Sequence, residues 1–248
     1  MVHKMKEINS LNNEYIKYLF KLKEKKFRNQ EKKFIIEGYH LVNEAYKANV
    51  LKEILVTNEI NEYNDIPKIK VTEPIINKLS TTVNPQNILG ICEIKDNKEI
   101  TGNKILLLDN INDPGNLGTL IRSSLGFNIS TIVLSPDCVD LYNEKVIRAT
   151  QGGIFKVNII IDDLEKVIKK LQDNNIKVFG TSLESSKFLQ EFKTVNKYAI
   201  LLGNEANGVK DKLLKLTDEN IKIEINEQLE SLNVAVAGSI IMYYFDNL

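Results

Sequence analysis

Histidine, cysteine and tryptophan are scarce in this chain of 248 residues. The two histidines, His3 and His40, lie near the start, so the sequence has no H-E-x-x-H zinc motif and its second half cannot supply a Ser-His-Asp triad. The two cysteines, Cys92 and Cys138, lack C-x-x-C spacing, which argues against a disulfide framework, a zinc ribbon and a thioredoxin-type pair. We therefore expect no metal site.

Long hydrophobic runs are also missing. No apolar stretch approaches the roughly 18 residues of a membrane span, and the N-terminal MVHKMKEINS has no signal-peptide core. We expect a cytoplasmic protein with no membrane partner. The composition is 43% hydrophobic and 27% charged, with 12 Gly and 5 Pro, which is ordinary for a globular protein. At about 150 residues per domain, the length allows one large domain or two modest ones.

The net charge is zero, with 33 basic and 33 acidic side chains, but the basic residues cluster. Residues 17–33 hold eight basic and two acidic side chains, whereas residues 101–248 hold 16 basic and 19 acidic ones. Such a cluster favours a polyanionic partner, and the alternative is a solvated helix face. Any contact with nucleic acid should therefore begin near the N-terminus.

The pattern of apolar residues predicts an α/β protein with two domains. The spacing in residues 10–26 predicts a capped amphipathic helix, and strand-like runs follow, which together indicate a small α/β domain over residues 1–95. A polar linker at 93–103 leads to a second domain, residues 103–248, in which strand-like and helix-like segments alternate. This alternation predicts helices on both faces of a mainly parallel sheet, with ligands bound beyond the carboxyl ends of the strands.

The first candidate loop, Asn110–Gly118, follows the apolar run ILLLD and leads into a helix that carries Arg122. Pro114 and Gly115 predict a tight turn, and the amides at the helix start would form an anion site near Asn116 and Arg122. The loop has neither the GK[ST] of a P-loop nor the spacing G-x-G-x-x-G. The alternative interpretation is an ordinary proline turn followed by a surface arginine.

Two further loops carry polar residues. Leu202–Gly208 follows the apolar run AILL, where Gly203 would let a ligand approach the backbone and Glu205 would be an unpaired acid in a cleft. Ser231 and Asn233 open a C-terminal helix that is apolar on nearly every face and must be buried, in the core or against a partner subunit. Each loop alone is also compatible with an ordinary turn or helix cap.

Together these three segments closely resemble, in order, the three motifs of the SpoU/TrmH RNA 2′-O-ribose methyltransferases of the SPOUT class. They are NxxDPxNxGxxxR (Asn110–Arg122), LGNExxGV (Leu202–Val209) and SLNVAVA (Ser231–Ala237). VIRATQGGIF resembles the family's Arg-Ala-Ser-x-Gly segment, with Thr150 in place of serine. The N-terminal FIIEG and TTVNPQNILGI are similar to the small RNA substrate-binding domain, of ribosomal-protein-like fold, that many members carry, so the resemblance covers most of the chain.

The resemblance implies a SPOUT-type α/β trefoil-knot domain with a parallel sheet, preceded by a small α/β RNA-binding domain. Members bind S-adenosyl-L-methionine in the knot and usually work as homodimers, here through the C-terminal domain. The family usually has Ile-Pro-Met before the third motif, whereas Glu224 replaces the proline in this chain. The family's catalytic positions fall on Asn116, Arg122, Glu205, Ser231 and Asn233, and its cofactor contacts fall on Leu202, Gly203, Ile223, Leu232 and Asn233.

The implied reaction is attack of a ribose 2′-hydroxyl, preferably of ribosomal RNA, on the methyl group of the sulfonium cofactor. Arg122 is the family's suggested base. Because an arginine pKa above ~12 keeps the guanidinium charged, stabilising the developing alkoxide and anchoring a phosphate is the alternative role. Asn116 and Asn233 would orient the ribose and the arginine, and Ser231 would fix its loop. The expected RNA contacts are basic: Lys25, Lys26, Arg28, Lys32, Lys33 and Arg148.

Other functions stay open at this point. A tRNA 2′-O-methyltransferase and a catalytically silent RNA-binding factor of ribosome assembly fit the same motifs. A relative that methylates a base nitrogen is disfavoured by Asn116 and Arg122 together with SLNV. A nucleotide-binding regulator would need a phosphate loop that the sequence lacks.

Overall fold

A computed structural model describes residues 5–95, 99–184, 186–193, 195–204 and 206–247 of the chain. These residues form two compact units. Unit 1 contains the described residues up to position 95 together with residues 140–155, and unit 2 contains the others. Residues 140–155 thus pack in unit 1, although the sequence analysis placed them within the second domain.

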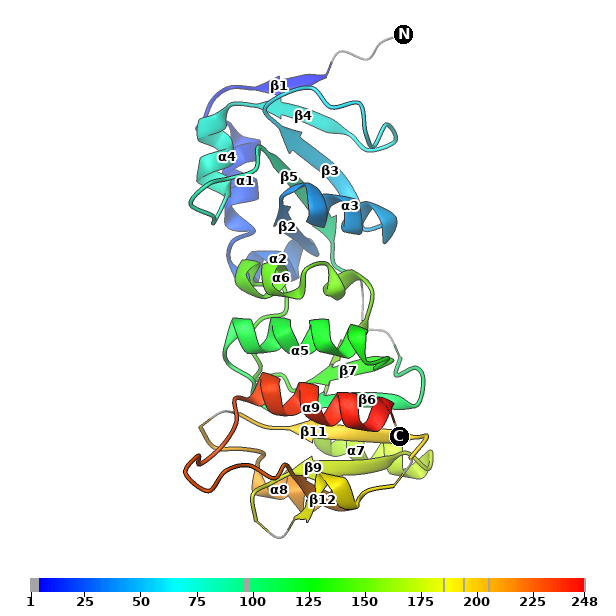
Figure 1. Cartoon of the computed structure of the whole chain (residues 1–248). Helices are drawn as coiled ribbons and strands as arrows, with labels where there is room; N and C mark the ends of the chain where they lie inside the picture. Colours follow the sequence, from blue (N-terminus) through cyan, green and yellow to red (C-terminus); the bar gives the residue numbers. More distant parts are fainter. Residues whose placement is uncertain (1–4, 96–98, 185, 194, 205, 248) are drawn as a thin grey trace. The chain divides into compact units, whose positions relative to one another are not determined.

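Unit 1 is built on a five-stranded mixed sheet (Figure 1). Its elements are β1 (Lys6–Ile8), α1 (Glu14–Lys21), α2 (Lys25–Glu31), β2 (Lys33–Glu37), α3 (Tyr39–Lys47), β3 (Leu51–Val56), β4 (Lys68–Val71), α4 (Glu73–Leu79), β5 (Ile88–Glu93), α6 (Glu144–Thr150) and η1 (Gly153–Phe155). The strand order is β1-β4-β3-β5-β2, with β5 antiparallel to both of its neighbours. One face packs against α1 and α4, and the other packs against α3 and the segment that carries α6 and η1.

The helix predicted for residues 10–26 forms as two helices, α1 and α2, with a short break between them. The guanidinium of Arg28 folds back and donates to the carbonyls of Leu22 at 2.8 Å and Lys23 at 2.6 Å. A continuous helix would use these two carbonyls as acceptors for its next turn. Arg28 therefore ends α1 where the apolar pattern alone predicts that it continues.

Unit 2 is built on a seven-stranded sheet in the order β10-β12-β9-β11-β6-β7-β8, and every pairing between its described strands is parallel. Its elements are β6 (Lys104–Leu108), α5 (Pro114–Gly126), β7 (Thr131–Leu134), β8 (Asn158–Ile161), α7 (Leu164–Asp173), β9 (Lys177–Thr181), β10 (Lys187–Phe188), η2 (Leu189–Glu191), β11 (Tyr198–Leu202), α8 (Asp211–Leu214), β12 (Glu219–Lys222) and α9 (Val234–Asp246). This sheet confirms the α/β prediction for the second half of the chain.

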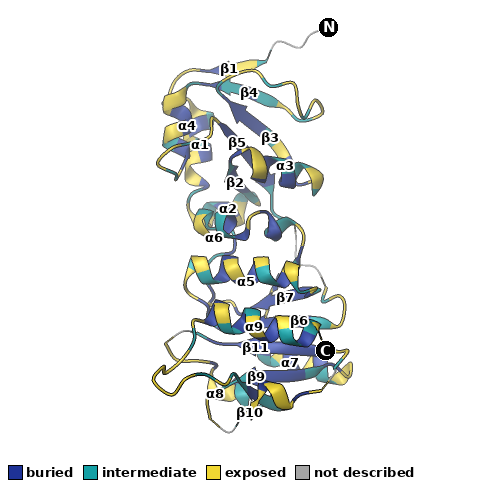
Figure 2. Cartoon of the chain, in the orientation of Figure 1, coloured by how far each residue is buried: buried dark blue, intermediate teal, exposed yellow. Residues whose placement is uncertain are grey.

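The central strands of this sheet are buried (Figure 2). Their apolar side chains point to both faces of the sheet. Along β11, Ala199 and Leu201 pack in one cluster with α7 and α8, whereas Leu202 faces α9 on the opposite side. Successive strand residues point to opposite faces, so an uninterrupted apolar run is needed where helices cover both. The prediction of helices on both faces is confirmed.

Candidate active site at the carboxyl edge of the parallel sheet

The loops that follow β6 and β11 lie side by side at the carboxyl edge of the unit 2 sheet. The two strands pair with Leu108 opposite Leu202, and the N–H of Asp109 donates to the carbonyl of Leu202 at 2.9 Å. The first and second motifs therefore leave the sheet at neighbouring positions, where ligands of parallel α/β sheets usually bind.

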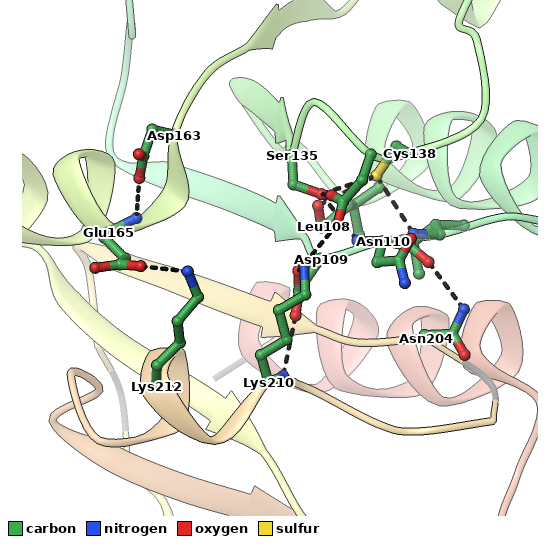
Figure 3. A network of polar contacts seen from close by, with 12 residues as sticks. Leu108, Asp109, Asn110, Ser135, Cys138, Asp163, Glu165, Asn204, Lys210 and Lys212 are labelled. Atoms are coloured by element: carbon green, nitrogen blue, oxygen red, sulfur yellow. Dashed lines mark hydrogen bonds and ion pairs between the residues drawn. The ribbon is translucent and has the colours of Figure 1, made fainter.

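A charged network joins these two loops (Figure 3). Asp109 is 1% exposed, and its carboxylate accepts the backbone N–H of Lys210 at 3.0 Å and pairs with the Lys210 ammonium at 3.0 Å. The same ammonium donates to Asp137 at 2.6 Å, which raises the pKa of Lys210. Partial burial opposes the hydrogen bonds from Lys210 and Ser135 to Asp137, yet the pKa of Asp137 is lowered. Both charges therefore persist at neutral pH and hold Lys210 beside Asp109, at the end of β6.

Asn110 turns the chain away from β6. Its backbone is left-handed (φ 55°), a conformation that asparagine adopts more readily than most residues. Its N–H donates to Ser135 Oγ at 2.9 Å, and its carbonyl accepts Asn204 Nδ2 at 2.9 Å. The N–H of Ile111 donates to Sγ of Cys138, whose thiol pKa is raised by burial. The Asn204 contact attaches the second motif to the first, and Ser135 and Cys138 attach the first motif to the segment after β7.

The first and third motifs meet through a direct hydrogen bond. Asn233 caps α9 by accepting the N–H groups of Ala235 and Val236, and its Nδ2 donates to Asn116 Oδ1 at 3.0 Å. Both asparagines are among the predicted catalytic residues. The structure brings them together although 117 positions separate them.

The start of α5 differs from the predicted anion site. Asp113 caps this helix and accepts the N–H of Asn116 at 2.8 Å, and Pro114 lies within the first helical turn. Pro114 and Gly115 therefore begin the helix rather than form a tight turn before it. The carboxylate of Asp113 thus already accepts one of the amides that the predicted anion site would use, the N–H of Asn116.

Helices α5 and α9 lie side by side on one face of the sheet (Figure 1). The hydroxyls of Ser123 and Ser239 are hydrogen-bonded at 2.7 Å. A Cβ on Gly238 would lie 2.5 Å from Leu202 Cδ1 and 2.7 Å from Leu120 Cδ2. The missing side chain at Gly238 thus allows α9 to approach both β11 and α5, which holds the third motif beside the other two.

Gly203 has no room for a side chain. Asn204 and Gly208 exchange two backbone hydrogen bonds, at 3.0 Å and 2.8 Å. A Cβ on Gly203 would lie 2.1 Å from backbone atoms of Gly208 and Val209. The sequence analysis predicts that a ligand approaches the backbone at Gly203. In the structure, the space where a side chain would lie is filled by the backbone of Gly208 and Val209.

Arg122 is exposed on α5 and lies on a different face from Asn116. Six helical positions separate the two residues, which places their side chains about 120° apart around the helix axis. Arg122 shares its face with Leu125, three positions later, which is also exposed. The structure therefore joins Asn116 to Asn233 but leaves Arg122 on another side of the same helix.

The remaining candidate positions of unit 2 lie at the ends of its strands and helices. Leu202 ends β11 and is buried, Ile223 follows β12, and Leu232 precedes α9 by two positions. Ile223 and Leu232 are half-buried, and Ser231 is exposed. Glu205 lies outside the described residues. Between β12 and α9 the chain forms neither helix nor strand.

The basic residues expected to contact RNA belong to unit 1. Lys25, Lys26 and Lys32 are exposed, and Lys33 is half-buried at the start of β2. Arg148 lies on α6 and donates through Nη1 to Thr81 Oγ1. These residues thus belong to one compact unit, although Arg148 is far from the others in sequence.

The prediction that Arg28 contacts RNA is wrong. The residue is 5% exposed, and its guanidinium pairs with Asp140 as well as with the two carbonyls at the end of α1. A buried guanidinium with these partners cannot contact an RNA phosphate. Arg28 instead ties the segment around α6 to α1 and α2.

Sequence reasoning missed Asp109, Asn204 and Lys210. A signal for Asp109 was present, because it directly follows a strand of fully buried apolar residues and a buried carboxylate requires a partner. Its partner Lys210 lies 101 positions away and is identifiable only from the fold. Asn204 falls within the second motif, but its contact with the carbonyl of Asn110 depends on the neighbouring strand.

In the part of the chain that the structure describes, no helix is long and apolar enough to cross a membrane. No group of three or more His, Cys, Asp or Glu side chains there could hold a metal ion.

Comparison with known proteins gives consistent matches. Residues 103–243 match the model of the SpoU rRNA Methylase family, and residues 13–90 match that of the MRM3-like substrate binding domain. The chain is 36% identical over 245 residues to the 23S rRNA (guanosine(2553)-2′-O)-methyltransferase RlmP of Bacillus subtilis, which covers 97% of this chain and 99% of that protein.

Two solved structures have the same fold. An AdoMet-bound rRNA methyltransferase from Sinorhizobium meliloti aligns with a TM-score of 0.90 and 26% identity over 98% of each chain. The SpoU methyltransferase AviRb from Streptomyces viridochromogenes, in complex with AdoMet, aligns with a TM-score of 0.87 and 18% identity over 95% of this chain and 98% of that one.

Proposed function

The chain belongs to the SpoU rRNA methylase family, and from this we propose that it transfers a methyl group from S-adenosylmethionine to a ribose 2′-hydroxyl of ribosomal RNA. The observation that carries the proposal is the hydrogen bond between Asn233 and Asn116, which joins the first and third motifs beside the second at one sheet edge. Similarity over nearly the whole chain to a protein named as a 23S rRNA methyltransferase favours rRNA over tRNA.

The residues at this edge fit S-adenosylmethionine. An adenine ring and a methionine chain require apolar surfaces and backbone hydrogen bonds, and Leu202, Ile223 and Leu232 are apolar residues at the ends of β11, β12 and the segment before α9. The irregular chain between β12 and α9 leaves backbone groups outside the sheet and helix ladders. When bound, the cofactor supplies an electrophilic methyl group on a sulfonium.

Asn116 and Asn233 orient one another. Because Asn233 Oδ1 accepts from α9 and its Nδ2 donates to Asn116 Oδ1, both amide groups have a defined orientation. We propose that they position the ribose, that Ser231 fixes the loop before α9, and that Gly203 contacts the cofactor through its backbone. Glu205 keeps the catalytic role that the family resemblance implies.

Arg122 acts as a cation rather than as a base in this proposal. A guanidinium stays protonated near pH 7, so it stabilises negative charge that develops on the 2′ oxygen and anchors a neighbouring phosphate. The hydroxyl proton then passes to the phosphate or to water. This role requires a positive charge at position 122. The Arg122→Lys variant should therefore keep part of the activity.

We propose that unit 2 forms a homodimer through the outer face of α5 and α9. Leu125, Val236, Ile240 and Tyr243 on these helices are each at least 38% exposed, and Figure 2 shows exposed stretches on both helices. Apolar side chains gathered in this way are typical of an interface. Arg122 shares a helix face with Leu125, so dimerisation would place it next to the second copy. An Ile240→Asp variant should be monomeric by sedimentation equilibrium and inactive.

We also propose that RNA is bound first by unit 1 and modified by unit 2. Support comes from the substrate-binding model matched by residues 13–90 and from the exposed Lys25 and Lys26. Residues 1–95 and 103–248 are the proposed domains in sequence, with residues 140–155 packed in unit 1. A ribosomal RNA substrate is consistent with a cytoplasmic protein.

The test is transfer of labelled methyl from S-adenosylmethionine to unmodified rRNA, with tRNA as a parallel substrate. We expect label in rRNA whose linkage resists alkali, because a methylated 2′-hydroxyl cannot assist backbone cleavage. Arg122→Ala should lower the rate by about 10²–10³-fold, and Arg122→Lys should retain more activity than Arg122→Ala. Equal loss in both variants would show that bidentate contacts are required instead of charge alone.

Each other outcome selects one of the alternatives. Label found only in tRNA would change the substrate class. Label that alkali releases would indicate a modified base. Binding of both cofactor and rRNA without any transfer would contradict the proposal and favour a silent factor of ribosome assembly.

A further inference from the structure

An exposed aromatic ring lies within the lysine-rich part of unit 1. Phe20, on α1, is 43% exposed, although phenylalanine usually lies inside a protein. Ile16 and Leu19 on the same helix are fully buried in the core. The apolar side of α1 is therefore complete without Phe20, whose ring is left at the surface.

Two ammonium groups lie over this ring as cation–π partners. Lys23 Nζ lies 5.0 Å and Lys78 Nζ lies 5.6 Å from the ring centroid of Phe20. Lys23 Nζ also donates to the carbonyls of Lys78 at 2.9 Å and Ser80 at 3.1 Å, and Lys78 Nζ donates to the carbonyl of Leu11 at 3.4 Å. Backbone groups from separate parts of the chain thus fix both charges beside the ring.

Helix α2 carries a second aromatic ring beside a lysine. Phe27 is half-buried, and Lys21 Nζ lies 5.5 Å from its ring centroid. Lys25 and Lys26 are exposed, and no carboxylate among the described residues forms an ion pair with Lys21, Lys25 or Lys26. Aromatic rings interleaved with unpaired cations are typical of surfaces that bind single-stranded nucleic acid.

Resting on the proposed RNA methyltransferase function, we propose that Phe20 is a stacking platform for an unpaired base of the RNA substrate. The exposed part of the ring is available to any base, and Lys23 and Lys78, whose ammonium groups lie over the ring, attract the adjoining phosphates without regard to sequence. A protein partner fits this surface less well, because interface cores are depleted in lysine. The surface therefore selects single-stranded RNA over a duplex, in which the bases are already stacked on one another.

The experiment measures binding of a single-stranded RNA that contains 2-aminopurine, with the same sequence as a duplex in parallel. Phe20→Ala should weaken single-strand binding by about 5- to 150-fold and reduce the fluorescence change that reports stacking. Its slope of log affinity against log salt should stay that of the wild type. Phe20→Tyr, which keeps the ring, should bind like the wild type, and neither variant should change binding of the duplex.

Lys78→Gln is the matched control for charge. It should lower the salt slope by about 0.7 while the 2-aminopurine signal persists. Thermal unfolding and cofactor binding should be unchanged in Phe20→Ala, because the residue lies at the surface of unit 1. Equal single-strand affinity of the wild type and Phe20→Ala would overturn this inference alone, if the wild type methylates rRNA. A wild type that neither binds nor methylates RNA would overturn the proposed function as well.

Discussion

The two units use their charged side chains differently. In unit 2 lysines pair with carboxylates of the same unit, as in Lys104–Asp246, Lys177–Glu219, Lys187–Glu219, Lys210–Asp109, Lys210–Asp137 and Lys212–Glu165. In unit 1, Lys21, Lys25, Lys26 and Lys33 form no ion pair with any described carboxylate. A net charge of zero conceals this contrast. Other lysines of unit 1 do pair with carboxylates, as in Lys17–Glu14, Lys47–Glu44, Lys52–Glu93 and Lys70–Glu7. The contrast therefore concerns Lys21, Lys25, Lys26 and Lys33, whose charge stays available to a polyanion.

Arg28 is the buried residue of the basic cluster in unit 1, and removing its partner Asp140 should have the largest effect on stability. Asp140→Ala should lower the stability of unit 1 by about 3–5 kcal/mol, because it leaves a buried guanidinium charge unpaired. Urea unfolding measures the change in the free energy of unfolding. Hydrogen exchange of the amides in β2 and α6 shows whether the loss lies in unit 1. The double variant Arg28→Met/Asp140→Leu should recover part of the loss, since no charge then remains buried. If Asp140→Ala lost no more stability than the removal of a surface ion pair does, the buried position of Arg28 would be contradicted.

The edge of unit 2 should tolerate less change than the surface of unit 1. Gly203→Ala should destabilise unit 2 by about 1–3 kcal/mol or more, because the new Cβ would overlap the backbone of Gly208 and Val209. It should also weaken cofactor binding, which calorimetry measures. Gly126→Ala is the matched control, since nothing lies within 4 Å of its Cβ position at the end of α5. That control should be neutral or slightly stabilising. If Gly203→Ala and Gly126→Ala have the same stability, the loop after β11 can shift enough to accommodate the new Cβ.

Acid should weaken unit 2 through its paired carboxylates. Hydrogen bonds from lysines lower the pKa of Glu219 and Asp246 below their ordinary values of 4.5 and 3.8. A carboxylate with a lowered folded-state pKa contributes stability above its unfolded pKa and loses it as the pH falls through the folded one. Unit 2 should therefore lose stability progressively below about pH 4.5. Unfolding of the wild type and Asp246→Asn at several pH values checks this, and the variant should show a weaker acid dependence. An equal loss of stability with acid in both proteins would show that Asp246 does not contribute to the acid sensitivity of unit 2.

The strands and the edge of the sheet were predictable from local patterns. The buried run from Ile105 to Leu108 has no polar interruption, as a parallel strand covered on both faces requires. The loops after β6 and β11 could be assigned to one edge because parallel strands end on the same side. The family motifs then predicted that Asn116 and Asn233 belong to one site.

Contacts between distant segments were not predictable in the same way. Residues 140–155 follow the strand-and-helix rhythm of the second half, yet Ile147 packs in the core of unit 1, where Tyr142 and Phe155 adjoin it. Arg28 looks like its lysine neighbours in sequence, and only Asp140, 112 positions later, explains its burial. Deleting residues 1–95 would remove the sheet against which Ile147 packs, so point variants of the full chain are the better test of RNA binding.

Charge reversal at the start of α2 should have the smallest effect on stability and should separate stability from function. Lys25 and Lys26 occupy the first turn of α2, whose N-cap residue Glu24 makes no side-chain cap, and the helix dipole is already positive there. Lys25→Glu and Lys26→Glu should each stabilise unit 1 by about 0.3–1 kcal/mol. Both should weaken RNA binding and lower its salt slope, because each removes a phosphate contact.

The matched control for this reversal is in unit 2. Lys170 lies in the last turn of α7, where a cation complements the negative end of the helix dipole. Lys170→Glu should therefore cost stability and leave RNA binding unchanged, the opposite pattern on both measurements. Since the dipole argument alone predicts only the two changes in stability, the changes in RNA affinity decide whether the lysines of α2 are kept for an external partner. If Lys25→Glu weakens RNA binding no more than Lys170→Glu does, the unpaired lysines of unit 1 do not bind RNA. The two variants would then differ only in their effect on stability.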